Sequence, residues 1–208
     1  MSKKCMVIPS EVLFEKKFTG FVSKDFHDYL TIIKNPDYQL FLDRYETSIV
    51  QELPAEYDSR FQQIIPYIVV KHNGKIFVYE RAPPGVNTEE RLASKLSVGV
   101  GGHIEPFDDD DDDLILATVK REMQEELGYL GEFYVTHKGY INFEESDVDK
   151  VHFGVVFVTE LKEHEFVFCN DEIVHGSFRT IEELRSHEVY NRLENWSRVI
   201  VDYIHMVL

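Results

Sequence analysis

Residues 101–129 read GGHIEPFDDDDDDLILATVKREMQEELGY, and the end of this stretch places Glu122, Glu125 and Glu126 in one short predicted helix. Carboxylates at helical spacing repel one another. At 100° per residue the three side chains point within about 100° of each other, while an adjoining apolar stripe faces a core. The crowding indicates that a cation lies among the carboxylates.

The ligand type indicates which cation is expected. Oxygen ligands at this spacing suit the hard ions Mg²⁺ or Mn²⁺ better than zinc, for which histidine and cysteine are typical. The glycines before the helix allow the backbone to come close and to offer a carbonyl ligand. The alternative is a solvated acidic face, which is the usual role of a charge run. The nine histidines have no H-x-x-x-H or H-x-H spacing, so the sequence predicts no zinc site.

The composition is that of a folded, acidic protein. The 208 residues are 43% hydrophobic and 13% aromatic, and they are enough to bury a core. The formal net charge of -16 makes nucleic acid polymers and anionic membranes poor partners, so a phosphate ligand would need a local cation. The longest apolar run is too short to cross a bilayer. Two cysteines, Cys5 and Cys169, and no leader sequence predict a cytoplasmic protein.

The chain is predicted to divide near residue 60. Residues 1–60 are expected to form a mostly helical extension, with one helix capped by Ser23 and stopped at residues 35–37. A second helix is expected over roughly 38–50. This extension is a candidate for shaping a pocket or for forming a homodimer interface.

Residues 61–208 alternate strand and helix patterns. Asn73-Gly74 predicts a β-hairpin, because both residues tolerate positive φ. Further strands are interleaved with a helix over 114–128, a capping box at Thr180–Glu183 and a helix over the last twenty residues. The expected architecture is α/β, a mixed sheet covered by helices on both sides.

The stretch quoted above resembles the signature of the Nudix hydrolases, G-x5-E-x7-R-E-U-x-E-E-x-G-U, where U is a bulky aliphatic residue. Gly102 takes the first position. The second half of the signature is matched in order by Arg121, Glu122, Met123, Glu125, Glu126, Leu127 and Gly128. There are two departures. The loop carries about five extra acidic residues, so either Asp108 or Asp113 takes the outlying acidic position, and Tyr129 replaces the last aliphatic residue.

The resemblance implies an α/β/α sandwich that hydrolyses a nucleoside diphosphate linked to another moiety. Glu122, Glu125 and Glu126 would hold Mg²⁺ together with the carbonyl of Gly101. Arg121 would orient a glutamate of the signature through a salt bridge. The implied partner is a small diphosphate compound.

The general base and the substrate contacts are less determined. The base is either a signature glutamate such as Glu125 or a later one, for which Glu172 is the candidate, and a surface position is the alternative for Glu172. Arg81 could reach the substrate from the sheet edge, with an ion pair as the alternative. Glu105 lies near the metal if its loop folds back, and is exposed otherwise.

Two other functions compete with hydrolysis. One is a catalytically silent sensor or regulator that binds a nucleotide or metabolite, against which the intact set of glutamates argues. The other is an isomerase of isoprenoid diphosphates, which would need a reactive cysteine near the metal. Neither Cys5 nor Cys169 has a suitable sequence context, and the substrate itself is not revealed by the sequence.

Overall fold

The computed structural model describes residues 3–48, 51–84, 92–106, 113–162 and 173–208. The chain forms two compact units that interleave in sequence. Unit 1 comprises Met1–Pro66, Gly102–Val119 and Gly139–Val155, and unit 2 comprises Tyr67–Gly101, Lys120–Lys138 and Val156–Leu208. The predicted boundary near residue 60 stays a prediction.

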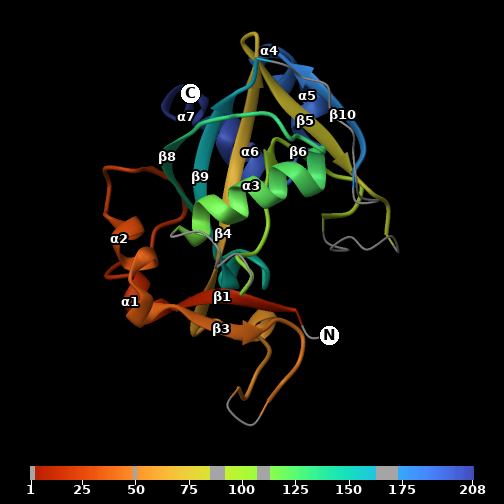
Figure 1. Ribbon diagram of the computed structural model, residues 1–208. Helices are drawn as coiled ribbons and strands as arrows, with labels where there is room; N and C mark the ends of the chain where they lie inside the picture. The colour runs from red at the N-terminus through yellow and green to blue at the C-terminus, as the bar shows by residue number, and fades with distance from the viewer. Residues whose placement is uncertain (1–2, 49–50, 85–91, 107–112, 163–172) are drawn as a thin grey trace. The chain divides into compact units, whose positions relative to one another are not determined.

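The elements of the described residues can be followed in Figure 1. Unit 1 contains β1 (Lys4–Pro9), α1 (Ser10–Leu13), β2 (Gly20–Ser23), α2 (Tyr29–Lys34) and β3 (Leu40–Asp43). Unit 2 contains β5 (Lys75–Arg81), β6 (Leu96–Ser97), β7 (Gly99–Val100), β10 (Ile173–Arg179), α4 (Ile181–Arg185), α5 (His187–Tyr190), α6 (Asn195–Asp202) and α7 (Ile204–Val207). Four elements run through both units: β4 (Phe61–His72), α3 (Leu114–Leu127), β8 (Val135–Asn142) and β9 (His152–Glu160).

The strands form a sheet in the order β10-β5-β4-β9-β8-β2, with β1 bonded to β3 and β4, β6 to β5, and β7 to β4. Antiparallel pairing holds β1 with β3, β2 with β8, and β5 with both β4 and β10. The predicted hairpin is confirmed, because β4 and β5 are joined by Asn73 at φ 49 and Gly74 at φ 73. Two successive residues at positive φ are typical of a type I′ turn.

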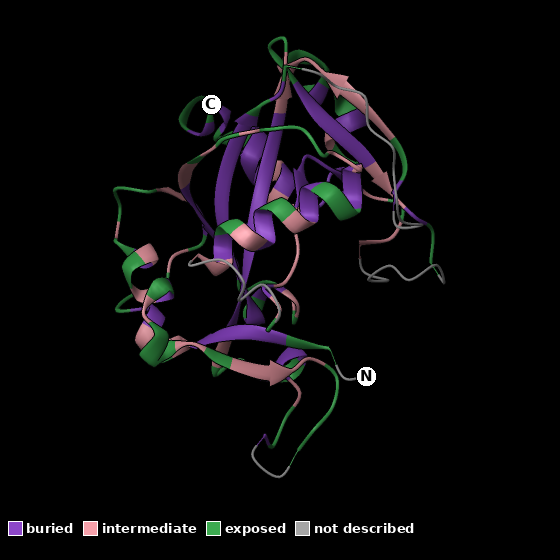
Figure 2. Cartoon of the chain, viewed as in Figure 1, coloured by how far each residue is buried: buried purple, intermediate pink, exposed green. Residues whose placement is uncertain are grey.

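The core lies along the strands. Figure 2 shows β4 and β9 buried over most of their length, as a strand covered on both faces requires. In Figure 1 helix α6 lies behind β4. Tyr67 of β4 packs edge-on against Trp196 of α6, with ring centroids 5.5 Å apart. The predicted α/β class is therefore confirmed.

The prediction of a mostly helical N-terminal extension is wrong. Unit 1 begins with β1, whose residues Cys5 to Ile8 are fully buried and which pairs with both β3 and β4. The segment Leu40–Asp43, expected to be helical, is the strand β3. Pairing on both sides of β1 explains the difference, since tertiary contacts override weak helical patterns.

The helices at the two ends of the chain are shorter than predicted. Helix α2 begins at Tyr29 and is capped by Asp28, which accepts a hydrogen bond from the Thr31 N–H, while Ser23 ends β2. The single C-terminal helix is divided into α6 and α7 at Tyr203, with φ -98 and ψ 21. The capping box of Thr180 and Glu183 at α4 is confirmed.

One close contact in unit 2 leads to a prediction about stability. A Cβ atom on Gly99 would lie 2.0 Å from Cζ of Tyr67, whose ring is held by Trp196 and by a 2.9 Å hydrogen bond between its hydroxyl and Ser197. We expect Gly99→Ala to lower the free energy of unfolding by about 1–3 kcal/mol through overpacking, measured by urea denaturation. In a Tyr67→Ala background the same substitution should cost clearly less. Equal costs in both backgrounds would contradict this explanation.

Candidate active site

Helix α3 positions the three glutamates of the signature. Asp113 begins the helix, because its carboxylate accepts hydrogen bonds from the N–H groups of Ile115 and Leu116. At the other end Gly128 has φ 61, and the N–H of Tyr129 donates to the carbonyl of Met123 at 3.1 Å. This left-handed ending favours glycine and fixes where the last turn stops. Glu122, Glu125 and Glu126 therefore lie in the last two turns.

The three glutamates differ in burial. Glu122 and Glu126 are 7% and 6% exposed, whereas the side chain of Glu125 is 57% exposed. Met123 and Leu127 on the same helix are fully buried. Two buried carboxylates one turn apart cost free energy unless positive charge or hydrogen bonds compensate them. Compensation of these charges is therefore the main electrostatic requirement of this part of unit 2.

Arg121 supplies part of that compensation. Its Nη1 lies 2.7 Å from Oε1 of Glu122 and 2.9 Å from Oε2 of Glu125. The guanidinium thus joins one buried and one exposed carboxylate. This is the geometry expected of a residue that orients glutamates, although the catalytic role of Arg121 stays a prediction.

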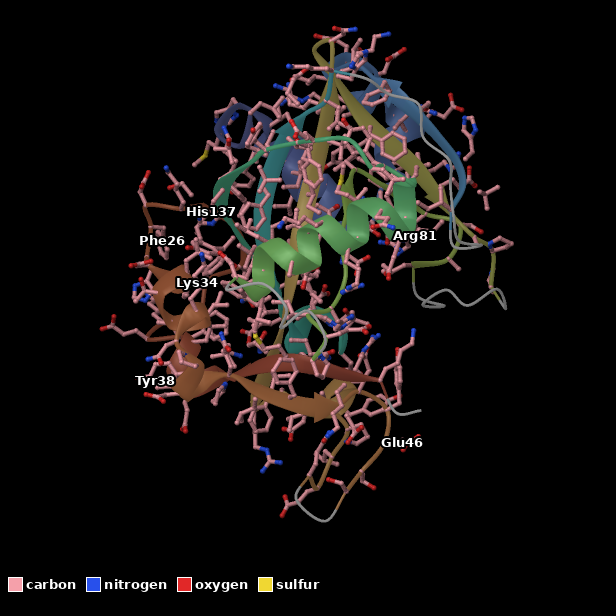
Figure 3. The ribbon with its side chains drawn as sticks, in the orientation of Figure 1. Phe26, Lys34, Tyr38, Glu46, Arg81 and His137 are labelled. Atoms are coloured by element: carbon pink, nitrogen blue, oxygen red, sulfur yellow. The ribbon has the colours of Figure 1, made fainter. Side chains whose placement is uncertain are left out.

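Arg81, the predicted substrate residue, makes a buried ion pair. Its Nε donates to Oε2 of Glu194 at 2.9 Å, and the two side chains are only 15% and 4% exposed. Burial by itself would lower the pKa of Arg81, but Glu194, Tyr79 and Glu126 raise it well above its usual value. Figure 3 shows Arg81 near the C-terminal end of α3. Arg81 therefore adds positive charge within electrostatic reach of Glu126.

Glu194 was not recognised from the sequence. Besides Arg81, it accepts hydrogen bonds from Ser97 Oγ at 2.7 Å, Tyr67 Oη at 3.3 Å and Ser197 Oγ at 3.4 Å. These residues come from three different elements, β4, β6 and α6, so no local pattern could connect them. The carboxylate is the centre of a buried polar network.

The other predicted residues are more scattered. Gly101 follows β7 and is half-buried. Glu105 is half-buried in unit 1, and contributes to the negative field around Cys5. Asp113 forms an ion pair with Lys34 at 2.6 Å, in addition to capping α3. Glu172, Cys169 and Asp108 lie outside the described residues.

A surface hollow in unit 1 contains none of the predicted site residues. Its lining consists of Glu15, Lys16, Lys17, Phe18, Phe26, His27 and Tyr29. Lys17 is ion-paired with Glu144. The hollow has mixed charges and no group of carboxylates, so the glutamates of α3 remain the better candidate for the reaction centre.

Comparison with known proteins now connects this geometry to a family. The family model for the NUDIX domain matches residues 62–202, more than half of the chain. The chain belongs to the Nudix hydrolase family. It is therefore a pyrophosphohydrolase, and hydrolysis of nucleoside diphosphate-linked compounds is the general activity that the family supports.

Three relatives illustrate the likeness. Protein YmaB of Bacillus subtilis (strain 168) is 37% identical over 155 residues, which cover 72% of this chain and 74% of YmaB. The crystal structure of Tm1382, a candidate Nudix hydrolase, has a TM-score of 0.71 at 23% identity and covers 97% of this chain and 98% of its own. The NUDIX domain of Shewanella oneidensis NrtR, complexed with ADP ribose, has a TM-score of 0.53 at 12% identity and covers 69% and 86%.

These structures share the Nudix fold, a mixed sheet with helices, with this chain. Within the described residues, no helix combines the length and apolar character needed to span a membrane.

The buried ion pair of Arg81 and Glu194 leads to a prediction about stability. Glu194→Gln leaves the Arg81 guanidinium buried without its carboxylate, and breaking such a pair costs about 3–5 kcal/mol. We expect a loss of this order in urea denaturation, with Glu188→Gln in α5, an exposed position, as the control. A loss no greater than in the control would contradict the importance of the pair.

Cys5 gives a second prediction, which bears on the isomerase alternative. The thiol is fully buried, its Sγ donates to Oε1 of Gln63 at 3.3 Å, and burial raises its pKa to about 12. In a Cys169→Ser variant, Cys5 should therefore stay unmodified by a thiol reagent at pH 8 until the protein is unfolded. Rapid modification of the folded variant would show that the thiol is accessible and reactive.

Proposed function

We propose that this Nudix enzyme is a Mg²⁺-dependent diphosphohydrolase, with Mn²⁺ as the substitute ion, that cleaves the diphosphate bond of a small nucleotide-type substrate in the cytoplasm. The observation that carries the proposal is the pair of buried carboxylates, Glu122 and Glu126, beside the exposed Glu125 on the same two turns of α3. A divalent cation would compensate the charge that these side chains concentrate.

The donor set fits a hard divalent ion. Glu122, Glu125 and Glu126 offer carboxylate oxygens only, and the carbonyl of Gly101 is the proposed fourth ligand. When bound, such an ion would neutralise phosphate charge, polarise the phosphorus and lower the pKa of a water molecule. The net charge of -16 makes this neutralisation necessary for an anionic substrate to bind.

Other side chains would support the reaction by position. Arg121 bridges Glu122 and Glu125, so it would hold both carboxylates in the orientation that ligation requires. Glu125 is more exposed than its neighbours and is our candidate for accepting the proton of the attacking water. Glu172 is the alternative base, and Glu105 and Arg81 are weaker candidates for substrate contacts.

The substrate class is proposed on chemical grounds. A nucleoside diphosphate linked to another moiety has the charged oxygens that a metal among carboxylates would bind. The ADP ribose bound to the similarly folded NrtR domain is a compound of this class. A sensor that binds such a compound without turnover is the second candidate function.

The glutamates can be tested by isosteric substitution. We expect Glu125→Gln and Glu126→Gln each to reduce Mg²⁺-dependent turnover at least about 100-fold, because each removes a charged ligand, while the unfolding midpoint changes little. Glu132→Gln, at an exposed position outside the helix, is the matched control and should keep full activity. Undiminished turnover in both α3 variants would refute the metal-site assignment.

A substrate panel tests the function itself. Phosphate release, after coupling to a phosphatase, is measured with nucleoside triphosphates, nucleotide sugars, dinucleoside polyphosphates and isoprenoid diphosphates, each with and without Mg²⁺. Mg²⁺-dependent turnover of one nucleotide class supports the proposal. No turnover with any compound, together with tight calorimetric binding of one of them, would replace it with the sensor.

A further inference from the structure

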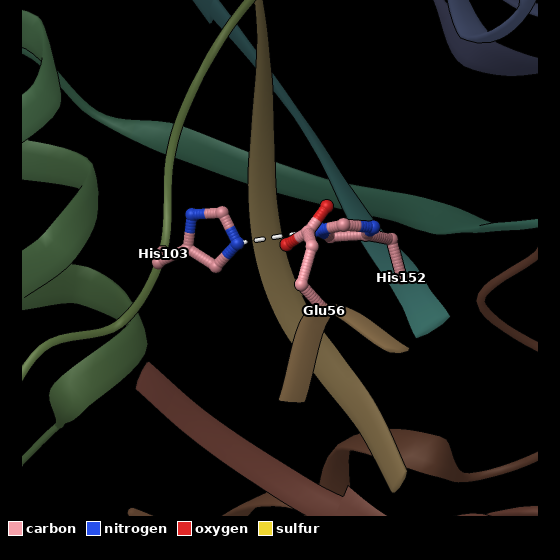
Figure 4. A group of neighbouring side chains, drawn as sticks. All are labelled: Glu56, His103 and His152. Carbon is pink, nitrogen blue, oxygen red and sulfur yellow. Dashed lines mark hydrogen bonds between the residues drawn. The ribbon is translucent and has the colours of Figure 1, made fainter. Parts of the chain in front are cut away.

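Unit 1 contains a second group of possible metal ligands, which Figure 4 shows. It consists of Glu56 in the turn Ala55–Tyr57, His103 in the loop before α3, and His152 at the start of β9. One ligand atom from each residue lies within 4.8 Å of the other two. Within the described parts of the chain, no other set of three His, Cys, Asp or Glu residues meets this criterion. All three residues belong to unit 1.

The two imidazoles face one another through the same ring atom. Nε2 of His103 lies 3.2 Å from Nε2 of His152. On its other side, Nδ1 of His152 lies 2.7 Å from the carbonyl oxygen of Val148, an acceptor to which an Nδ1–H donates. This bond places the proton on Nδ1 and leaves the Nε2 lone pair directed into the cluster. Metal-ligating histidines commonly have such a bond to a backbone carbonyl.

The carboxylate of Glu56 is fixed by further contacts. It is 2% exposed, and its Oε2 accepts hydrogen bonds from Arg44 Nη2 at 3.2 Å and from Gln63 Nε2 at 3.4 Å. Two side-chain donors therefore hold the carboxylate of Glu56 in one orientation.

The surrounding charges allow a cation to bind. Arg44 is positive, but the field acting on the neighbouring Cys5 also includes the negative charges of Glu56, Glu105 and Asp43. The three carboxylates outnumber the guanidinium, and the whole chain carries a net charge of -16. A bound divalent ion would reduce this local excess of negative charge.

We propose that Glu56, His103 and His152 bind one Zn²⁺ ion. Two imidazole nitrogens and one carboxylate oxygen form a donor set that favours zinc over Mg²⁺, and three protein ligands leave one position for water or an outside ligand. Ligands about 2.05 Å from a tetrahedral ion lie about 3.3 Å from each other. The 3.2 Å separation of the two Nε2 atoms matches this value. The site shares no ligand with the Mg²⁺ site proposed above, although His103 lies two residues from Gly101.

A hydrogen-bonded network without metal is the competing explanation. In it His103 donates to His152, and Glu56 is satisfied by Arg44 and Gln63. Both explanations account for the distances, but only the zinc site predicts stoichiometric, histidine-dependent binding of a transition metal. Metal binding therefore decides between them.

The experiment is a titration of the full, chelator-treated chain with Zn²⁺ by calorimetry, and with Co²⁺ by visible absorption, in excess Mg²⁺ to occupy the glutamates of α3. We expect one equivalent to bind and intense absorption bands of tetrahedral Co²⁺ to develop. His103→Ala should weaken binding at least about 100-fold and abolish the bands, because a half-buried direct ligand is lost. His205→Ala, at an exposed position in α7, is the matched control and should bind as the unaltered protein does.

Circular dichroism first establishes that each variant is folded, and Glu56→Gln provides a second, nearly isosteric loss of a ligand. Equal Zn²⁺ affinity in His103→Ala, Glu56→Gln and the control would overturn the proposal. If Zn²⁺ binding is lost in Glu122→Gln instead, the ion belongs to α3, and this result would also overturn the proposal. The absence of stoichiometric binding to the unaltered protein would leave the hydrogen-bonded network as the explanation.

Discussion

Buried carboxylates set the main electrostatic constraint on this fold. The chain has 38 Asp and Glu against 22 Lys and Arg, so positive charge is scarce. The buried carboxylates of the described residues nevertheless include Glu56, Glu126 and Glu194. Each would be costly without compensation, and the fold meets this requirement in a different way at each place.

At Glu194 the compensation is internal, because Arg81, two serine hydroxyls and a tyrosine hydroxyl surround the carboxylate. Glu56 is held by Arg44 and Gln63, close to two histidines. On α3, Arg121 is shared between two glutamates of a set of three. We assign the neutralisation of the remaining negative charge on α3 to a divalent ion. The same ion would then stabilise the buried glutamates and take part in the chemistry of the family.

The sequence predicted features that depend on nearby residues. The hairpin at Asn73-Gly74, the capping box at Thr180 and the helix predicted over 114–128 all follow from local conformational preferences, and the structure contains them. Features that depend on distant pairing were predicted wrongly or missed. The strand β1 is specified by two partners rather than by its own pattern, and a helix was expected in place of β3.

The same distinction applies to the functional residues. Arg121, Glu122, Glu125 and Glu126 are neighbours in sequence, so their spacing was informative. His103 and His152 are separated by 49 positions, so a search for short histidine motifs predicted no zinc site, although the fold places the two rings 5.3 Å apart. Glu194 lies 113 positions from Arg81 and was missed for the same reason.

Mn²⁺ binding to α3 can be measured by electron paramagnetic resonance without knowledge of the substrate. We expect the unaltered protein to bind Mn²⁺ and Mg²⁺ to compete for the site. Glu122→Gln and Glu126→Gln should each weaken Mn²⁺ binding strongly while the protein stays folded. Unchanged Mn²⁺ binding in both folded variants would show that the buried carboxylates of α3 are not the ligands.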